Sequence, residues 1–345
     1  MAIKEGGIMN NTILKENDPV VIIKYRLMDD MPKLKSGISF IEHYEKMYGF
    51  DFDEYIKTAY KILSDTQIEY RYLTNKVKLF YAKTSLTEGD LNNYFLKMRP
   101  ITACDEKSVE NITDLLLIDN EKIQIEYSEQ GNYGDINVCC IPLRIPDHIC
   151  ILTDKIQKVY DLKYLMHELG RAIPLSSTFS NIKLLREYLF NEIMQEAYAY
   201  LYEDLVVYNS DFRKAFQLML SQSDIDNCRF EELYKIRLLA AKVIYQKEFY
   251  SKDNKDYLRT FYQEIMQNSL LINCNSSTYS IDSVSDFSTI QKFIGKVIAS
   301  KIQIHIENQF GLGWYKNKNA SITLNHLFSH GGLVNPNNFE RFLLS

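Results

Sequence analysis

The 345 residues of this chain, 46% of them hydrophobic and 25% charged, suffice to bury a large core, and the length allows about one to three domains. A net charge of -5 without basic clusters argues against nucleic acid or an anionic membrane as the main partner. Residues 1–11 hold no apolar signal core, and no apolar run approaches the roughly 18 residues of a membrane span. We therefore expect a cytoplasmic protein.

The first part of the chain is predicted to be helical. Between residues 38 and 94, apolar side chains recur at the spacing of an amphipathic helix, as in Tyr55, Ala59 and Ile62. Two or three packed helices are expected here.

Between residues 115 and 152 the pattern changes to short runs rich in β-branched residues. These runs cover residues 115–118, 123–127, 136–141 and 148–152, and residues 131–135 are typical of a turn. A small sheet is predicted. Helical periodicity then continues from residue 161 to the end, with breaks near residues 176–181, 209–211, 221–227, 273–277 and 311–319. We predict a helical N-terminal region over residues 1–114 and a sheet-then-helices region over residues 115–345, joined in one continuous body.

The stretch from Tyr164 to Arg171 carries the most informative motif. In H-E-x-x-H, two histidines four residues apart lie on one face of a helix and hold zinc, while the glutamate activates a water molecule. His167 and Glu168 match the first two positions, but Arg171 stands where the second histidine is needed. An arginine stays protonated and offers no lone pair to a metal. The sequence thus predicts either a peptidase or a peptidase body without its chemistry.

A second predicted helix, over residues 182–207, carries Glu196 and Glu203, which lie two turns apart on one face. An antiparallel helix can bring such a glutamate opposite the histidine, as in zinc sites with two histidines and one glutamate. Taken alone this is a weak signal, because many helices carry such residues and a His-Glu-x-x-Arg helix is typically a solvated ion-pair face.

Several segments together resemble the thimet oligopeptidase and oligoendopeptidase F family of zinc metallopeptidases. The similar segments are residues 133–140 and 149–152, the helix over residues 161–173, the Glu-x6-Glu pattern of residues 196–203 and the glycine-rich turn of residues 327–336. The resemblance covers roughly residues 62–342. It implies a mainly α-helical, α+β fold: a two-lobed, gluzincin-like metallopeptidase body with a small β-sheet and a central cleft.

The resemblance also implies roles for individual residues. His167 and Glu196 would be zinc ligands, Glu168 the general base and Glu203 a partner of the ligands. The turn and edge strand that align a substrate backbone would be formed by Tyr133, Gly134, Ile136 and Val138.

The chain also departs from the family pattern. Arg171 replaces a ligand, Pro174 replaces a further histidine, and residues 288–293 replace the segment rich in tyrosine and histidine that would stabilise the oxyanion. Since two ligands do not hold catalytic zinc, we hypothesise that the Arg171 guanidinium occupies the place of the metal and forms a bidentate pair with Glu196.

The leading functional hypothesis is a divergent oligopeptidase relative, without zinc, that binds a peptide or a protein segment along the edge strand without hydrolysing it. In the first alternative the chain is an active zinc metalloendopeptidase that cleaves oligopeptides, and the candidates for the missing ligand are His148, His305, His326 and His330. In the second alternative it is a structural subunit of a larger complex. Nucleic acid and membranes are not expected as partners.

Overall fold

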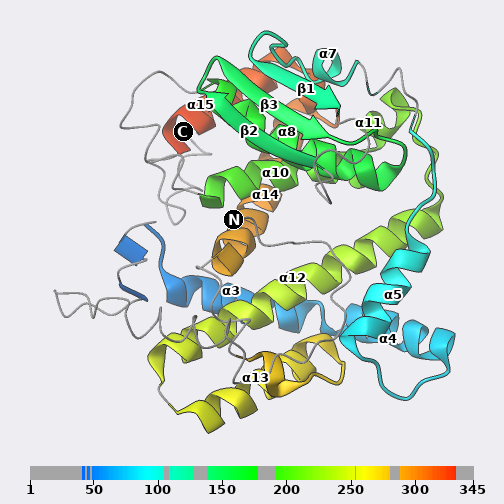
Figure 1. Cartoon of the computed structure of the whole chain (residues 1–345), viewed down its shortest axis with the longest axis vertical. Coiled ribbons are helices and arrows are strands. Elements are labelled where there is room, and N and C mark those ends of the chain that lie inside the picture. The colour runs from blue at the N-terminus through cyan, green and yellow to red at the C-terminus, as the bar shows by residue number, and fades with distance from the viewer. Residues whose placement is uncertain are drawn as a thin grey trace. The chain divides into compact units, whose positions relative to one another are not determined.

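The structure is a computed structural model that describes residues 41–42, 45–46, 49–104, 109, 111–127, 138–177, 192–252, 254–279 and 288–331. It is mainly helical with one small sheet, as predicted (Figure 1). The chain forms two compact units that interleave along the sequence: one takes Met1–Met98 and Arg229–Phe293, the other Arg99–Cys228 and Ile294–Ser345. The division at residues 114 and 115 concerned successive regions of the chain and stays a prediction.

The first unit is built from helices, as the periodicity of residues 38–94 indicated. α3 (Phe52–Asp65), α4 (Gln67–Tyr81) and α5 (Glu88–Met98) are joined by most of α12 (Gln222–Ser251), by α13 (Lys255–Leu270) and by a short 3-10 turn, η1 (Ser276–Thr278). The Asp51 carboxylate accepts a hydrogen bond from the Glu54 N–H and so caps the first turn of α3. Helices α4, α5, α12 and α13 share an aromatic core that includes Tyr70, Phe95, Phe230, Tyr245 and Tyr262.

A polar cluster at the start of α12 was interpreted as part of a break over residues 221–227, and that prediction is wrong. The Ser221 hydroxyl accepts a hydrogen bond from the Asp224 N–H, and the Asp224 carboxylate accepts one from the Ser221 N–H. This reciprocal pair is a capping box. The polar residues therefore begin a helix at Gln222 instead of separating two helices.

A fully buried arginine joins three helices of this unit. Arg237 on α12 donates to the Leu63 carbonyl at 2.8 Å and to the Ser269 carbonyl at 2.8 Å, near the ends of α3 and α13. It also donates to Thr66 Oγ1 at 2.5 Å and to Gln67 Oε1 at 2.6 Å, at the start of α4. Carbonyls near helix ends lack partners within the helix, so this guanidinium satisfies groups that burial would otherwise leave unpaired.

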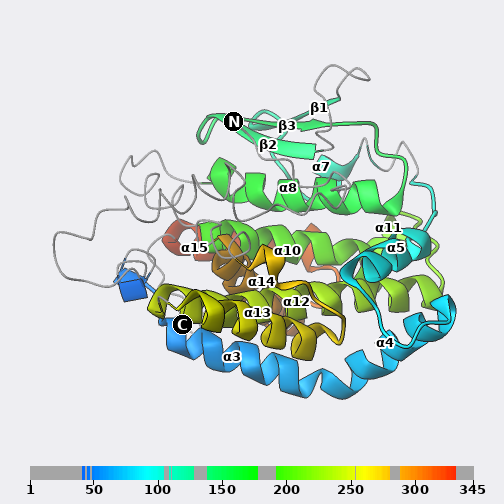
Figure 2. The same cartoon turned by 60° about the horizontal axis from the view of Figure 1, so that its bottom comes forward.

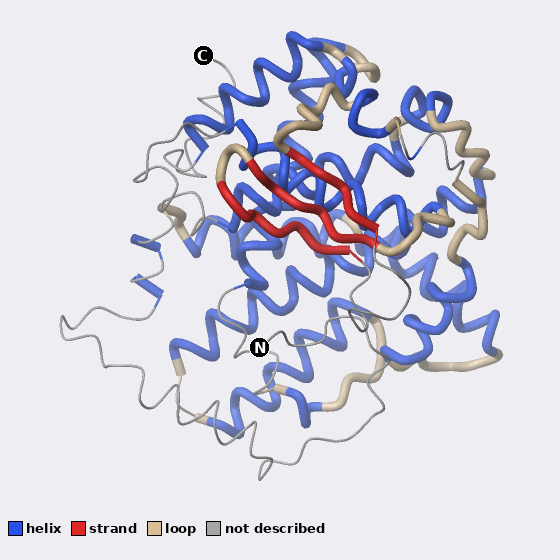
Figure 3. The backbone as a smooth tube through the Cα atoms, turned by 45° about the horizontal axis from the view of Figure 1, so that its top comes forward, coloured by secondary structure: helices blue, strands red, loops and turns tan. Residues whose placement is uncertain are grey.

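The second unit contains the sheet, which Figure 3 shows as three neighbouring strands. β1 (Ile123–Tyr127) pairs in parallel with β3 (His148–Thr153), and β2 (Val138–Arg144) pairs antiparallel on the other side of β3. Three of the four predicted strands are therefore confirmed, and the run over residues 115–118 is not a strand. It follows α7 (Ile112–Leu115), where Ile112 and Leu116 are buried at helical spacing.

Helices α8 (Val159–Ser177) and α10 (Glu192–Tyr208) lie beneath the sheet as successive layers (Figure 2). α11 (Ser210–Ala215), α14 (Ser288–Phe310, in this unit from Ile294), η2 (Trp314–Lys316) and α15 (Lys318–Gly331) complete the unit. The helix predicted over residues 161–173 extends further than expected and includes Pro174. Of the helix predicted over residues 182–207, the structure describes the part from Glu192 onward.

Two glycines allow α10 to approach its neighbours closely. A Cβ atom on Gly170 of α8 would lie 2.5 Å from the Tyr198 carbonyl oxygen, and one on Gly295 of α14 would lie 2.7 Å from the Glu196 Cβ. Any larger residue would push these helices apart. Within the described residues, no helix combines the length and the apolar character needed to cross a membrane.

Candidate functional site

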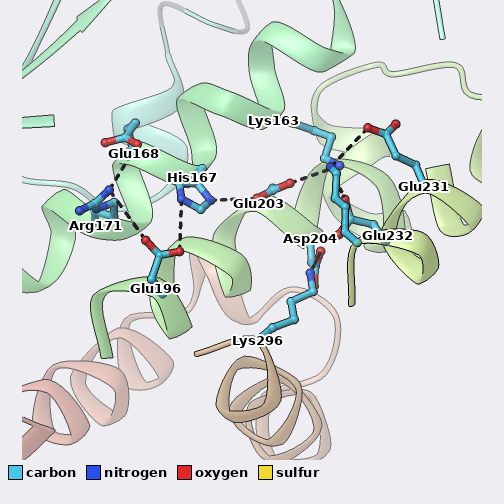
Figure 4. A network of polar contacts seen from close by, with 11 residues as sticks. Lys163, His167, Glu168, Arg171, Glu196, Glu203, Asp204, Glu231, Glu232 and Lys296 are labelled. Carbon is cyan, nitrogen blue, oxygen red and sulfur yellow. Dashed lines mark hydrogen bonds and ion pairs between the residues drawn. The ribbon is translucent and has the colours of Figure 1, made fainter. Parts of the chain in front are cut away.

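One face of α8 carries three basic residues at successive helical turns. Lys163, His167 and Arg171 are four residues apart, so their side chains follow the same stripe of the helix. Opposite them, α10 presents Glu196 and Glu203 two turns apart. The close crossing of α8 and α10 brings the two rows together (Figure 4).

The five side chains form an alternating row of charges. Glu203 holds two partners: its Oε1 lies 3.3 Å from Lys163 Nζ, and its Oε2 lies 2.8 Å from His167 Nδ1. Glu196 lies between the next two, with Oε2 4.0 Å from His167 Nε2 and Oε1 3.9 Å from Arg171 Nη1. The contacts of Glu203 are therefore tight, whereas those of Glu196 are longer than hydrogen bonds.

Glu168 lies on the other side of Arg171 and connects the helix to the sheet. Its Oε2 accepts a hydrogen bond of 2.9 Å from the Cys140 N–H on β2, and its Oε1 lies 3.9 Å from Arg171 Nη1. The residue expected to act as general base is thus held between a strand N–H and a guanidinium.

The electrostatics of the row favour charged side chains. Burial lowers the pKa of His167, but the hydrogen bond and charge of Glu203, together with Glu196 and Glu168, raise it by more, so the pKa lies above its ordinary value. Burial also lowers the pKa of Arg171, while Glu168 and Glu196 raise it to a higher value than usual. Three carboxylates face the Lys163 ammonium and the Arg171 guanidinium, and an imidazolium at His167 would balance the charge.

The proposed pairing of Arg171 with Glu196 is present, but its geometry differs from the prediction. A bidentate pair was expected, and the structure has a single approach of 3.9 Å. The Arg171 guanidinium instead lies equally far from Glu168 and Glu196, and its side chain is 34% exposed. An arginine at this distance has not saturated its hydrogen-bonding capacity.

These residues do not fit a zinc ion. A metal next to His167 and Glu196 would have two protein ligands, whereas catalytic zinc is held by three. Arg171 would add a positive charge beside that metal. Within the described residues, no group of three or more histidine, cysteine, aspartate or glutamate side chains is arranged to hold a metal. Of the candidate replacement ligands, His148, His305 and His326 are among these residues, and the His330 side chain lies outside them.

Sequence reasoning missed Lys163, although it stands one helical turn before His167. Its side chain is 4% exposed, and a buried lysine requires a counter-charge, which Glu203 supplies. Reading the basic residues of the helix at intervals of four would have identified it. The Cys140 N–H had no sequence signal, because every non-proline residue carries one.

The predicted substrate-contacting residues are described only in part. Tyr133, Gly134 and Ile136 lie outside the described residues, as does the glycine-rich turn from residue 332 onward. Val138 begins β2, which is an edge strand of the sheet. Their roles stay predictions, as do those of His167, Glu168, Arg171, Glu196 and Glu203.

The fold is similar to those of solved peptidase structures. A candidate oligoendopeptidase F from Bacillus anthracis str. Ames matches with a TM-score of 0.54 at 15% sequence identity, over 89% of this chain and 60% of that one. A second candidate oligoendopeptidase F gives a TM-score of 0.53 at 13% identity, over 89% and 61%. Metallocarboxypeptidase 1 of Trypanosoma cruzi gives 0.51 at 11% identity, over 83% and 63%.

These likenesses confirm a peptidase-like fold. No protein-family model matches the sequence, and no curated protein does. The chain covers 60% to 63% of the length of the three solved structures. Membership in the oligoendopeptidase F family stays a prediction.

Proposed function

We propose that this chain is a divergent relative of oligoendopeptidase F that binds an extended peptide or protein segment and does not hydrolyse it by a metal-dependent reaction. The observation that carries the proposal is the position of Arg171. Its guanidinium lies 3.9 Å from both Glu168, the base in this proposal, and Glu196, the metal ligand that the resemblance implies. If Glu168 and Glu196 have these roles, a permanent cation lies beside both of the carboxylates that the metallopeptidase reaction uses around its metal.

The state of Glu168 supports the absence of hydrolysis. A general base must have a carboxylate oxygen available to bind the attacking water and take its proton. Here the carboxylate already accepts the Cys140 N–H and lies beside Arg171. Glu168 therefore acts as a structural clamp between α8 and β2.

The edge strand β2 supports peptide binding. Because the Cys140 N–H points to Glu168 and away from β3, the backbone groups of Val138, Cys140 and Pro142 face the outer edge of the sheet. Glu168 already accepts the Cys140 N–H, so a peptide would pair with the Val138 N–H and with the outward carbonyls of these residues. Pro142 has no N–H to lose there, which is the position that a strand tolerates for proline. Leu143 is 60% exposed and Ile141 38%, so the strand also offers apolar side chains to a partner. A peptide can pair with such an edge by β-augmentation.

The first test asks whether Arg171 is the residue that prevents zinc from binding. Metal content is measured by elemental analysis for the unmodified protein and for Arg171→His, both purified without a histidine tag. We expect no zinc in the unmodified chain and stoichiometric zinc in the variant. Stoichiometric zinc in the unmodified protein, together with cleavage of a fluorogenic pool of random peptides, would overturn the proposal.

The second test addresses binding. The same peptide pool, labelled but not quenched, is titrated with the protein and followed by fluorescence anisotropy. We expect saturable binding without turnover, and a loss of roughly tenfold in Val138→Pro, which removes an outward N–H and leaves the β3 pairing intact. Ile322→Asp is the matched control, because this exposed residue lies on α15. Equal affinities of the unmodified protein and Val138→Pro would exclude the β2 edge.

The runner-up function is an active metallopeptidase, and the likeness to a metallocarboxypeptidase fold favours it. It requires another side chain to complete the zinc site. The metal analysis above distinguishes the two functions directly.

A further inference from the structure

The outer face of α4 carries an apolar stripe that the first unit does not use. The face of α4 that enters the aromatic core holds Tyr70, Thr74 and Val77. On the opposite side, Ile68 is 87% exposed, Tyr72 60% and Leu79 81%. A surface helix normally has one apolar face. The second stripe therefore points to a partner.

The stripe has the spacing of a coiled-coil seam. Ile68, Tyr72, Asn75 and Leu79 follow one another at intervals of four, three and four residues, which are the d, a, d and a positions of a heptad. Asn75 is exposed in the middle of the seam. A single polar residue in such a seam favours a partner helix that presents a matching polar group, at a cost in affinity. A stripe of this width matches a single partner helix better than a wide, flat protein surface.

The flanking positions of the seam are mainly basic. Arg71 and Lys78 occupy the g positions and Lys76 an e position, while the remaining e position is Glu69, which pairs with Arg229 at 3.1 Å. Within the described part of the chain, none of the three basic residues forms an ion pair. The Lys76 ammonium lies 4.5 Å from the centre of the Tyr72 ring and so borders the stripe directly.

We propose that the outer face of α4 is a docking site for an amphipathic helix of a partner protein, with apolar residues along its seam and acidic residues beside it. Charges at the e and g positions determine which helices pair. A second copy of α4 would place basic residues opposite basic residues, and a membrane surface would gain little from a seam interrupted by Asn75. An acidic helix satisfies both the seam and its flanks.

The test uses two synthetic peptides with the full-length protein. Both carry leucine at the a and d positions with one matching asparagine; one has glutamate at e and g, the other lysine. We expect saturable binding of the glutamate peptide by fluorescence anisotropy, weaker binding at high salt, and no binding of the lysine peptide. Ile68→Glu combined with Leu79→Glu is expected to weaken binding by roughly tenfold or more.

Two further variants keep the test decisive. Arg71→Glu combined with Lys76→Glu alters two exposed residues and is expected to exchange the preference, so that the lysine peptide binds. Ile304→Glu on α14, where the isoleucine is 63% exposed, is the matched control and should bind as the unmodified protein does.

Three results would overturn the proposal. The first is no saturable binding of the glutamate peptide, or equal binding of both peptides. The second is binding to phosphatidylglycerol vesicles that the Ile68 and Leu79 variant loses while the peptide does not bind. The third is a dimer in sedimentation experiments that the same variant dissociates.

Discussion

Two arginines, one in each compact unit, differ in burial and in how their guanidinium groups are bound. Arg237 is fully buried and donates short hydrogen bonds to neutral oxygens of Leu63, Thr66, Gln67 and Ser269. Arg171 is 34% exposed and lies 3.9 Å from two carboxylates without a hydrogen bond to either.

The difference separates structure from function. Saturated hydrogen bonds in a dry environment hold helices together, and this is the geometry of a structural arginine. Long ion pairs in a partly exposed place leave donors available and tolerate the replacement of one group by another. We therefore expect a substitution of Arg171 to be tolerated better than one of Arg237, which joins several helices.

The largest loss of stability is expected for a substitution of the buried Arg237. Arg237→Met leaves the carbonyls of Leu63 and Ser269 buried without donors, and we expect a loss of roughly 3–4 kcal/mol in the free energy of unfolding. Chemical denaturation measures this. Arg71→Met on the exposed side of α4 is the control and should change the value by less than about 0.5 kcal/mol. A similar small change in Arg237→Met would contradict the comparison.

Removing the carboxylate of Glu203, which has the shortest contacts in the charged row, should destabilise the protein nearly as much. Glu203→Gln removes the carboxylate that Lys163 and His167 share, and the buried lysine then loses this counter-charge. We expect a loss of about 3 kcal/mol in unfolding free energy. Adding Lys163→Met to that variant should recover part of the loss, and a purely additive double variant would show that the two side chains are not coupled.

The close crossing of α8 and α10 can be tested separately from its charges. Gly170→Ala would place a Cβ 2.5 Å from the Tyr198 carbonyl oxygen, and backbone atoms must move to make room. We expect a loss of about 2 kcal/mol in unfolding free energy. Gly89→Ala on α5 has its nearest neighbour at 3.8 Å and should be neutral or stabilising. Equal stabilities of the two variants would exclude the role given to Gly170.

Removing Glu196, whose contacts are longer, should destabilise the protein less than removing the carboxylate of Glu203. A buried, hydrogen-bonded pair loses roughly 3–5 kcal/mol when one partner is removed. Glu196 approaches its partners at 4.0 Å and 3.9 Å, and Arg171 can reach water, so we expect Glu196→Ala to cost about 1–2 kcal/mol. A loss as large as that of Glu203→Gln would show that the longer contacts of Glu196 stabilise the protein as much as the shorter contacts of Glu203.

The smallest effect is a dependence on pH. Because the pKa of His167 is raised above its ordinary value of 6.5, the imidazolium stabilises the fold fully below about pH 6.5, and this contribution is lost as the pH rises through the folded-state pKa. The stability difference between the unmodified protein and His167→Gln should therefore shrink as the pH rises above about 6.5. Thermal melting across this range measures it, and a difference independent of pH would contradict a protonated His167.

Much of the fold followed from local patterns. The helical spacing of residues such as Tyr55 and Ala59 indicated α3, and β-branched runs indicated the three strands. The errors arose where a local pattern had two interpretations. Residues 221–227 are polar enough for a loop but form a capping box, and residues 115–118 are apolar enough for a strand but continue a helical burial pattern from Ile112.

The sequence by itself determined that His167 and Arg171 share one face of their helix and that Glu196 and Glu203 share one face of theirs, because residues four or seven positions apart lie on the same side of a helix. It also determined that Arg171 cannot bind a metal, since this is a property of the guanidinium itself. Only the tertiary structure decided how these groups pair. The crossing at Gly170 brings Glu203 to Lys163 and His167, and the position of β2 gives Glu168 the Cys140 N–H. Such contacts depend on distances of a few tenths of an ångström between elements far apart in the chain, and no local pattern encodes them.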